Sequence, residues 1–318
     1  VTTDDTKLTA SVTSADVGTN KAVTVSVATG YLTGTKASSY YVSSVTGSPV
    51  LTITQATQAA LSWTSALTTV YGSTLTLSAT GGSGTGALSY ATTGGPCTVS
   101  SSIVTPTSVG TCVVVVTRAA DTNYTAQTLS GNVTITQATQ STVTMTSATT
   151  VVYGSTLTLT ASGGDGTGAY DYAVVTGDCS LSGDVLSSGS VGDCVVKARR
   201  LSSTNYSTSS WSSQVTVSVT AKPLTVSLTP VDRQWNGGTS ISMQSASASN
   251  LTGVVAGDTV GVDNSKLSAS VATAAVGSNK AVTITVATGF LTGADAGNYL
   301  LPTVRSEERR VGKECLRL

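Results

Sequence analysis

The sequence predicts an all-β protein made of small β-sandwich modules in tandem. Apolar and hydroxyl residues alternate in many short segments, including 23–27, 215–220 and 282–286. Alternation with a period of two gives a strand one face toward a core and one face toward water. Thr and Val, which favour strands, recur along the chain, and Gly, Asn, Asp and Ser supply turns between the alternating segments.

A long segment that occurs twice, without a gap, predicts the modules. Tyr-Gly-Ser-Thr-Leu-Thr-Leu starts at Tyr71 and again at Tyr153, and two cysteines follow each copy. The offsets 153−71, 179−97 and 194−112 are all 82. Such a period exceeds the roughly 20–50 residues of solenoid repeats, and it is long enough to close its own core. We therefore expect an array of separately folded domains.

A second repeat occurs once near each end of the chain. Val-Gly-Thr-Asn-Lys-Ala-Val starts at Val17, and its close copy starts at Val276, an offset of 276−17 = 259. Counted from Lys222, the C-terminal copy has 266−222 = 44 residues ahead of Lys266, whereas six residues precede the matching Lys7. The first module is therefore expected to lack its first strands and to expose an unpaired sheet edge, which we interpret as truncation.

These repeats divide the chain into five segments. They are a truncated β module at 1–53, two β-sandwich modules at 54–136 and 137–220, a second module of the first kind at 221–303, and a charged tail at 304–318. Ile-Thr-Gln-Ala-Thr-Gln opens both central modules directly from a strand, so neighbouring modules are expected to be closely coupled. The tail holds every Glu of the chain, and we interpret it, with Cys315, as non-native.

The composition of the 318-residue chain excludes several classes of partner. Net charge is zero and only 10% of the residues are charged, so nothing favours nucleic acid or an anionic membrane surface. No apolar run reaches the roughly 20 residues of a membrane helix, so we expect no membrane insertion. The positive mean hydropathy of +0.20 argues against a disordered chain.

Four cysteines form two pairs with the same spacing of 15, since 112−97 equals 194−179. We predict disulfides Cys97–Cys112 and Cys179–Cys194, each within one hairpin or between neighbouring strands. A loop of this size stabilises a fold by roughly 3 kcal/mol. Zinc would need closer spacing and usually His, which the chain lacks. Disulfides indicate an oxidising, exported location.

The motifs resemble repeats of large bacterial surface and secreted adhesins. The central modules, through Tyr71, residues 82–87, the cysteine pair and Tyr124, resemble bacterial immunoglobulin-like repeats. The outer modules resemble the YDG-type repeats of filamentous-haemagglutinin-like proteins, although the name-giving Tyr-Asp-Gly is Trp-Asn-Gly at 235–237. The resemblance implies tandem immunoglobulin-like β-sandwich modules in an elongated array, and it implies no particular ligand.

Two glycine-rich segments, 82–86 and 164–168, could be mistaken for phosphate-binding loops. Such loops need a helix after them, and the alternation that follows here predicts a strand. We expect tight hairpin turns instead.

Other candidate sites are weak. Clustered oxygen ligands for calcium could come from five aspartates of the second central module, Asp165, Asp171, Asp178, Asp184 and Asp193, yet no D-x-D-x-D run occurs and we predict no metal site. Without His, and without Glu outside the tail, we predict no catalytic residues, no cofactor and no enzyme. Lys21 beside Asn20, and Lys280 beside Asn279, are read as surface turns and not as isopeptide crosslinks. The three tryptophans, Trp63, Trp211 and Trp235, are expected to fill cores or joints.

The sequence thus predicts a non-enzymatic stalk, outside the cell or on a bacterial cell surface, that spaces a binding domain from the cell. Its partners would be an unknown surface ligand or neighbouring copies of itself. The alternatives are a carbohydrate-binding array with an aromatic groove in each module, and a self-assembling fibre in which the edge of module one accepts a strand.

Overall fold

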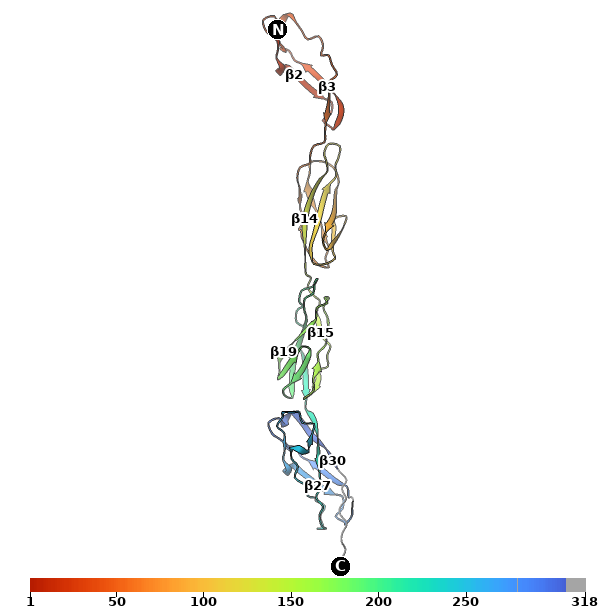
Figure 1. Cartoon of the computed structure of the whole chain (residues 1–318), viewed down its shortest axis with the longest axis vertical. Helices are drawn as coiled ribbons and strands as arrows, with labels where there is room; N and C mark the ends of the chain where they lie inside the picture. Colours follow the sequence, from red (N-terminus) through yellow and green to blue (C-terminus); the bar gives the residue numbers. More distant parts are fainter. Residues whose placement is uncertain (279, 307–318) are drawn as a thin grey trace, which may run out of the picture. The chain divides into compact units, whose positions relative to one another are not determined.

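The computed structural model describes residues 1–278 and 280–306. The described elements are the short strands β1–β30 and five 3-10 turns, so the predicted all-β class is confirmed (Figure 1). The chain divides into two compact units with the boundary in the sequence between Ala138 and Thr139, and each is described by itself. No sheet of the described residues combines strands from two of the modules predicted above.

The first module has little core. β2 (Leu8–Val12), β3 (Gly18–Val27) and β5 (Val50–Ile53) form an antiparallel sheet, and β1 (Thr2–Thr3) pairs with β4 (Leu32–Thr33). Two 3-10 turns, η1 (Asp5–Lys7) and η2 (Ala37–Ser39), separate them. Every side chain from residue 1 to residue 53 is at least partly exposed.

The first central module is a sandwich. One sheet has the order β10 (Leu88–Gly94), β13 (Gly110–Arg118), β14 (Gln127–Thr136) and β7 (Thr68–Val70), with β7 parallel to β14. The other strands are β11 (Cys97–Ser100), β12 (Ile103–Pro106) and β8 (Leu75–Thr76) in one sheet, and β6 (Leu61–Trp63) with β9 (Ala79–Gly81) in another. The alternating valines Val114 and Val116 are fully buried between them.

The second central module repeats this topology. Its larger sheet has the order β16 (Thr150–Val152), β23 (Val215–Thr220), β22 (Gly192–Arg200) and β19 (Tyr170–Thr176). The smaller sheets are β17 (Leu157–Thr158), β21 (Val185–Ser188) and β20 (Cys179–Ser182), and β15 (Val143–Met145) with β18 (Ala161–Gly163). The two copies differ in the segment before β23. There the buried Ser209 hydroxyl accepts the Arg200 N–H and the Ser212 hydroxyl accepts the Ala198 N–H, whereas the matching residues of the first copy belong to strand β14.

The last module has a central strand with no counterpart in residues 1–53. β24 (Lys222–Leu228) lies between β25 (Leu251–Thr252) and β30 (Tyr299–Ser306), and it runs parallel to β30. The other pairs are β26 (Gly261–Val262) with β29 (Leu291–Thr292), and β27 (Leu267–Val271) with β28 (Val282–Val286). Three 3-10 turns complete it: η3 (Ala248–Asn250), η4 (Asn264–Lys266) and η5 (Ala296–Asn298).

The boundary of the predicted tail differs from the structure. β30 continues to Ser306, three residues beyond the expected end of the module at 303, because its backbone follows β24 as far as Leu228. The interpretation of the tail from 307 onward, including Cys315, lies outside the described residues, as does Asn279.

Candidate functional site

Both cysteine pairs form disulfides, with Cα–Cα distances of 5.8 Å for Cys97–Cys112 and 6.1 Å for Cys179–Cys194. Their position differs from the predicted hairpin or neighbouring strands. The hairpin is β11 with β12, whereas the first bond joins β11 to β13, which belongs to the opposite sheet. The second bond likewise joins β20 to β22. Each disulfide therefore joins the three-stranded sheet of its module to the four-stranded one.

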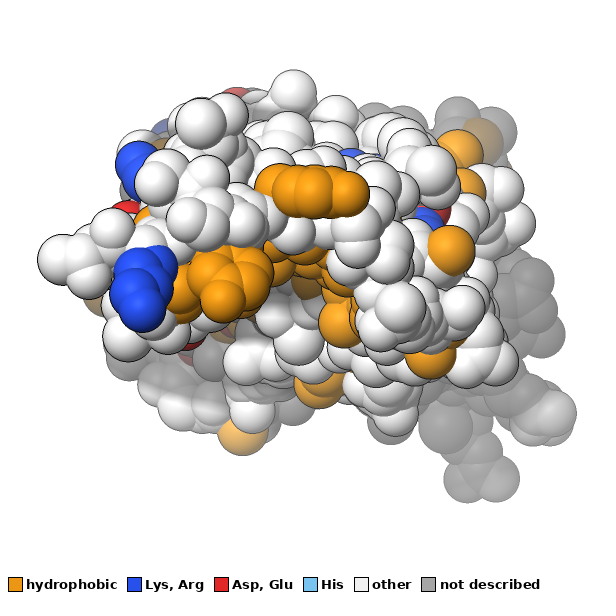
Figure 2. Space-filling model, turned by 90° about the horizontal axis from the view of Figure 1, so that it is seen from above, with side chains coloured by type: hydrophobic (Ala, Val, Ile, Leu, Met, Phe, Trp, Pro, Cys, Tyr) orange, Lys and Arg blue, Asp and Glu red, His pale blue; other side chains and the backbone are white. Residues whose placement is uncertain are grey.

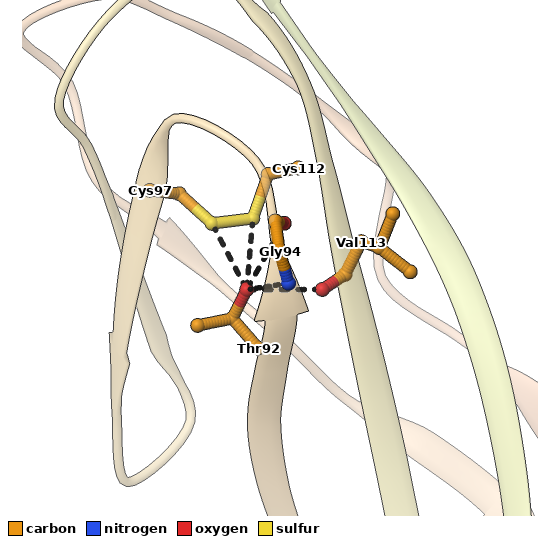
Figure 3. Close-up of a disulfide and its surroundings, with 5 residues drawn as sticks. All are labelled: Thr92, Gly94, Cys97, Cys112 and Val113. Carbon is orange, nitrogen blue, oxygen red and sulfur yellow. Dashed lines mark hydrogen bonds between the residues drawn. A yellow bond between two sulfur atoms is a disulfide. The ribbon is translucent and has the colours of Figure 1, made fainter.

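Figure 3 shows the surroundings of the first disulfide. The Thr92 hydroxyl donates to the Val113 carbonyl at 3.0 Å, and it accepts the Gly94 N–H at 3.3 Å. Its oxygen lies 3.6 Å from Cys97 Sγ and 3.7 Å from Cys112 Sγ. This hydroxyl holds the bulge between Thr92 and Gly94, where the register of β10 against β13 shifts beside the disulfide.

The glycine-rich segment 82–86 is held by a buried amide and an arginine. Arg118 Nη1 donates to the Gly84 and Gly86 carbonyls at 3.2 and 3.0 Å. Gln58, which is 7% exposed, accepts the Gly84 N–H, and its Nε2 donates to the Ala119 and Thr125 carbonyls. A Cβ at Gly86 would lie 2.0 Å from the Ala119 carbonyl oxygen, so only glycine fits there.

The prediction of a tight hairpin turn is wrong for this segment. β9 and β10, which it connects, belong to different sheets, so the chain crosses the sandwich here. The second copy is built in the same way: Arg200 donates to the Gly163, Gly164 and Gly168 carbonyls, and Gln140 accepts the Gly166 N–H.

Sequence reasoning missed the two residue pairs that hold these loops. Gln58 and Arg118 return as Gln140 and Arg200, since 140−58 and 200−118 both equal 82. The sequence did contain a signal for these pairs. In repeats that consist mostly of hydroxyl and apolar residues, a Gln and an Arg keep the same positions in both copies. Gln58 and Gln140 end the opening motif of the two central modules, which was interpreted as a joint, whereas both side chains bond to carbonyls of their own module.

A junction within the first unit connects the first module to the first central module. Asn123 Oδ1 accepts the Val17 N–H at 2.9 Å, and Asn123 Nδ2 donates to Asp16 Oδ1 at 2.9 Å. The hydroxyl of Ser14 and then the amide of Asn123 hold the pKa of the Asp16 carboxyl below its usual value. Asp121 holds the turn that carries Asn123, since its Oδ1 accepts the N–H groups of Asn123 and Tyr124.

The second unit contains a junction of the same kind. Asn298 Oδ1 accepts the Val191 N–H of the second central module at 2.9 Å. In both junctions, the acceptor is an Asn that precedes a Tyr, and the donor is the N–H of a Val that precedes a Gly. The two junctions join the two kinds of module in opposite orders, so the same contact serves both.

Two buried tyrosines strengthen the second junction. Tyr153 of the central module and Tyr299 of the last module meet edge to face, with ring centroids 5.7 Å apart. The Tyr153 hydroxyl donates to Asp258 Oδ2 at 3.0 Å, and the Tyr299 hydroxyl donates to the same oxygen. The Val255 N–H donates to the Tyr299 hydroxyl at 2.9 Å. Burial, and then the Asp258 carboxylate, raise the pKa of Tyr299 to about 12.

The aspartates weighed as calcium ligands make separate local contacts. Asp165 accepts the Ser141 N–H, Asp171 pairs with Arg199 at 2.8 Å, and Asp193 accepts the Ser218 hydroxyl. Within the described residues, no three His, Cys, Asp or Glu side chains are placed to hold a metal ion. No helix in the described part of the chain is long and apolar enough to cross a membrane.

The tryptophans and lysines have different surroundings from one another. The indole N–H of Trp63 donates to the Ser130 carbonyl, and Lys197 and Arg199 lie over the Trp211 ring. The residue Trp235 has 68% of its surface exposed, so the expectation that it fills a core or joint is wrong. Lys21 donates to the Asp16 carbonyl, and Lys280 to the Thr273 and Ala275 carbonyls.

Comparison with known proteins identifies one module. Residues 220–306 match the YDG domain. This confirms the resemblance of the last module to YDG-type repeats, while the immunoglobulin-like and filamentous-haemagglutinin-like resemblances stay predictions. Among solved structures, domains 4–9 of the surface layer protein SbsC are similar, with 15% identity and a TM-score of 0.21. The similarity covers 73% of this chain and 43% of that one. No curated protein matches the sequence.

Proposed function

We propose that this chain is a non-enzymatic structural segment of an extracellular surface protein, a stalk that spaces a binding domain from the cell. The observation that carries the proposal is the repeated junction. Asn123 and Asn298 each tie one module to the main chain of the preceding module, beside a bonded Asp16 or a buried Tyr153. Contacts of this kind restrict hinge motion between neighbours, which a spacer requires.

The disulfides support the same proposal. They join opposite sheets of each central sandwich, so the closed segment cannot extend when the module is pulled from its ends. Disulfides persist in oxidising surroundings, which favours a location outside the cell or on its surface. The YDG domain at 220–306 is the kind of repeat that the sequence resemblance places in surface adhesins.

The polar clusters of the described residues favour a structural role over catalysis. Gln58 with Arg118, and Asp258 with its two tyrosines, satisfy main-chain groups or hydroxyls at the ends of modules. A general acid or base works best with a pKa near the working pH, and the tyrosine pKa values at the junction move upward, away from it.

Pulling single full-length chains from both ends tests the spacer function. We expect separate unfolding events for the two central modules, each shortened by its closed disulfide loop of 15 residues. Reduction should lengthen each event by about 50 Å, from roughly 3.3–3.6 Å per extended residue. Extension of the whole chain at negligible force, with no separate events, would contradict a role under tension.

One observation favours a second candidate, a carbohydrate-binding array. The exposed ring of Trp235 has the amphipathic surface on which sugars stack, and Arg233 and Asn236 beside it can donate hydrogen bonds. A glycan array probed with the full chain and with Trp235→Ala tests it. Binding that the substitution abolishes would favour this candidate, and equal signals from both proteins would exclude Trp235 as a platform.

A further inference from the structure

The sequence contains a single Asn-Gly step, formed by Asn236 and Gly237. It lies in the segment 231–239 of the last module, and this described segment contains neither strand nor helix. Both residues are exposed. Glycine has no Cβ to shield its main-chain nitrogen, so that nitrogen can approach the carboxamide of the preceding Asn closely. The loop therefore presents to water the two groups that react in a deamidation.

Two donors converge on the carboxamide oxygen of Asn236. Its Oδ1 accepts the Gly238 N–H at 3.1 Å, and Arg233 Nη1 donates to the same atom. Arg233 Nη2 donates in turn to the Gly238 carbonyl, which holds the guanidinium in the loop. Donors placed in this way stabilise the negative charge that develops on a carbonyl oxygen when a nucleophile adds to its carbon. The carboxamide carbon of Asn236 is therefore activated for attack.

The nucleophile that lies next to this carbon in the chain is the main-chain nitrogen of Gly237. Within the described residues, its N–H makes no hydrogen bond. The space around this residue is also open, since a Cβ at Gly237 would meet only the Trp235 ring, at 4.0 Å, apart from its chain neighbours. No contact of the described residues therefore holds the nitrogen away from the Asn236 side chain.

We propose that Asn236 is a modification site, which loses ammonia to form a succinimide with Gly237 and then opens to aspartate and isoaspartate. The Gly237 nitrogen gives its proton to hydroxide from the solvent and forms a bond to Asn236 Cγ. The bond between Cγ and Nδ2 breaks, and Nδ2 takes up a solvent proton and leaves as ammonia. One water then adds to either carbonyl of the ring and opens its C–N bond. The chain thus exchanges an amide for a carboxylate.

The product changes the charge of a chain that has few charges. Only 10% of the residues are charged, and the face of the molecule in Figure 2 shows few Lys, Arg, Asp or Glu side chains. Deamidation takes the net charge from 0 to 16 − 17 = −1. The aspartate product has the acidic residue of the name-giving Tyr-Asp-Gly motif at this place. Its carboxylate accepts the same two donors, and the bond from Arg233 becomes charge-assisted.

Asn264 of the same module is a matched control within the chain. It is also exposed and also precedes a small residue, Ser265. Its Oδ1 accepts the Ala246 N–H at 2.8 Å, and its Nδ2 donates to the Ala246 carbonyl at 3.0 Å. The Ser265 N–H, which would be the nucleophile, donates to Asp263 at 2.9 Å. Both reacting groups are occupied, so Asn264 should keep its amide.

Ageing the full chain at mildly alkaline pH in heavy-oxygen water tests the inference, with peptide mapping by mass spectrometry as the readout. Asn236 should convert at least about tenfold faster than Asn264, where three hydrogen bonds must open first. The products should be aspartate and isoaspartate, each with a single heavy oxygen from water. Arg233→Ala should slow the conversion about tenfold, less than in an enclosed oxyanion hole because water reaches this loop. Asn236→Gln, whose longer side chain must close a larger ring, should gain no label at this position.

Several results would overturn the inference. These are an Asn236 that stays intact in the folded chain while a denatured sample deamidates, equal rates at Asn236 and Asn264, and aspartate without isoaspartate, which would indicate direct hydrolysis of the amide. An unchanged or faster rate in Arg233→Ala would contradict activation of the carboxamide by the guanidinium. The inference does not depend on the spacer function, because pulling and scattering do not report on the charge of this loop.

Discussion

Asp258→Ala removes the carboxylate that accepts both tyrosine hydroxyls at the junction of the second unit. Tyr153 and Tyr299 are 5% and 6% exposed, so their hydroxyls would lose a partner without regaining water. A hydrogen bond to a charged group contributes about 1.5–3 kcal/mol, and we take the lower half because Asp258 itself is half-buried. Tyr299 keeps the Val255 N–H as a donor. Two such bonds, at about 1.5–2.2 kcal/mol each, should cost the junction about 3–4.5 kcal/mol in all.

Hydrogen exchange read by mass spectrometry suits this prediction, because a chain of several modules does not unfold in one step. The opening free energy of β30 and of β16 should fall in Asp258→Ala, while that of β13 in the first unit stays unchanged. Asp232→Ala, which removes the same charge from an exposed position of the same module, is the control. A difference below about 0.5 kcal/mol between the two variants would refute the reasoning, since that is the range of surface substitutions.

Three further predictions follow from the site. The pKa of Tyr299 is raised from 10.0 to about 12, so the unfolded chain loses this proton at lower pH than the folded one. The stability that this group contributes is present below pH 10 and should be lost as the pH rises toward 12. Tyr299→Phe should remove this dependence when denaturation is measured as a function of pH. Serines in place of Cys97 and Cys112 should destabilise the first central module by roughly 3 kcal/mol in segment-resolved hydrogen exchange, with β22 unaffected. Asn123→Ala should raise the amide exchange rate of Val17 by about tenfold, and an unchanged rate would mean that the junction is held by other contacts.

The fold class was predictable because its cause is local. Alternation of Val and Thr sets which face of each strand is buried, and it needs no knowledge of the partner strand. The repeats were equally informative, since an unbroken offset of 82 identifies copied units whatever their topology. The residues of the last module alone are enough to match it to the YDG domain.

What the sequence could not supply is which sheet each strand joins. The spacing of 15 between Cys97 and Cys112 suits a hairpin as well as two strands of opposite sheets, and the intervening β12 decides for the second. The glycine-rich segment 82–86 has the composition of a turn, although it crosses the sandwich. Trp235 was expected in a core or joint because large aromatic residues are usually covered, whereas this ring is 68% exposed.

The junctions were missed for a related reason. Asn123 and Asn298 are ordinary polar residues in turns. Their side-chain Oδ1 atoms accept a Val N–H that belongs to the preceding module. Contacts over more than a hundred residues of sequence leave no local pattern. The identical Asn-Tyr and Val-Gly pairs were visible, but nothing in the sequence connects one pair to the other.

Small-angle scattering of the full chain with intact disulfides, measured as a concentration series, tests the spacer most directly. The proposal predicts an elongated particle, on the order of 100–150 Å for four modules with strands of about 27 Å, whose length does not change with concentration. A compact particle would contradict the spacer function, and a length that grows with concentration would favour assembly by strand exchange instead.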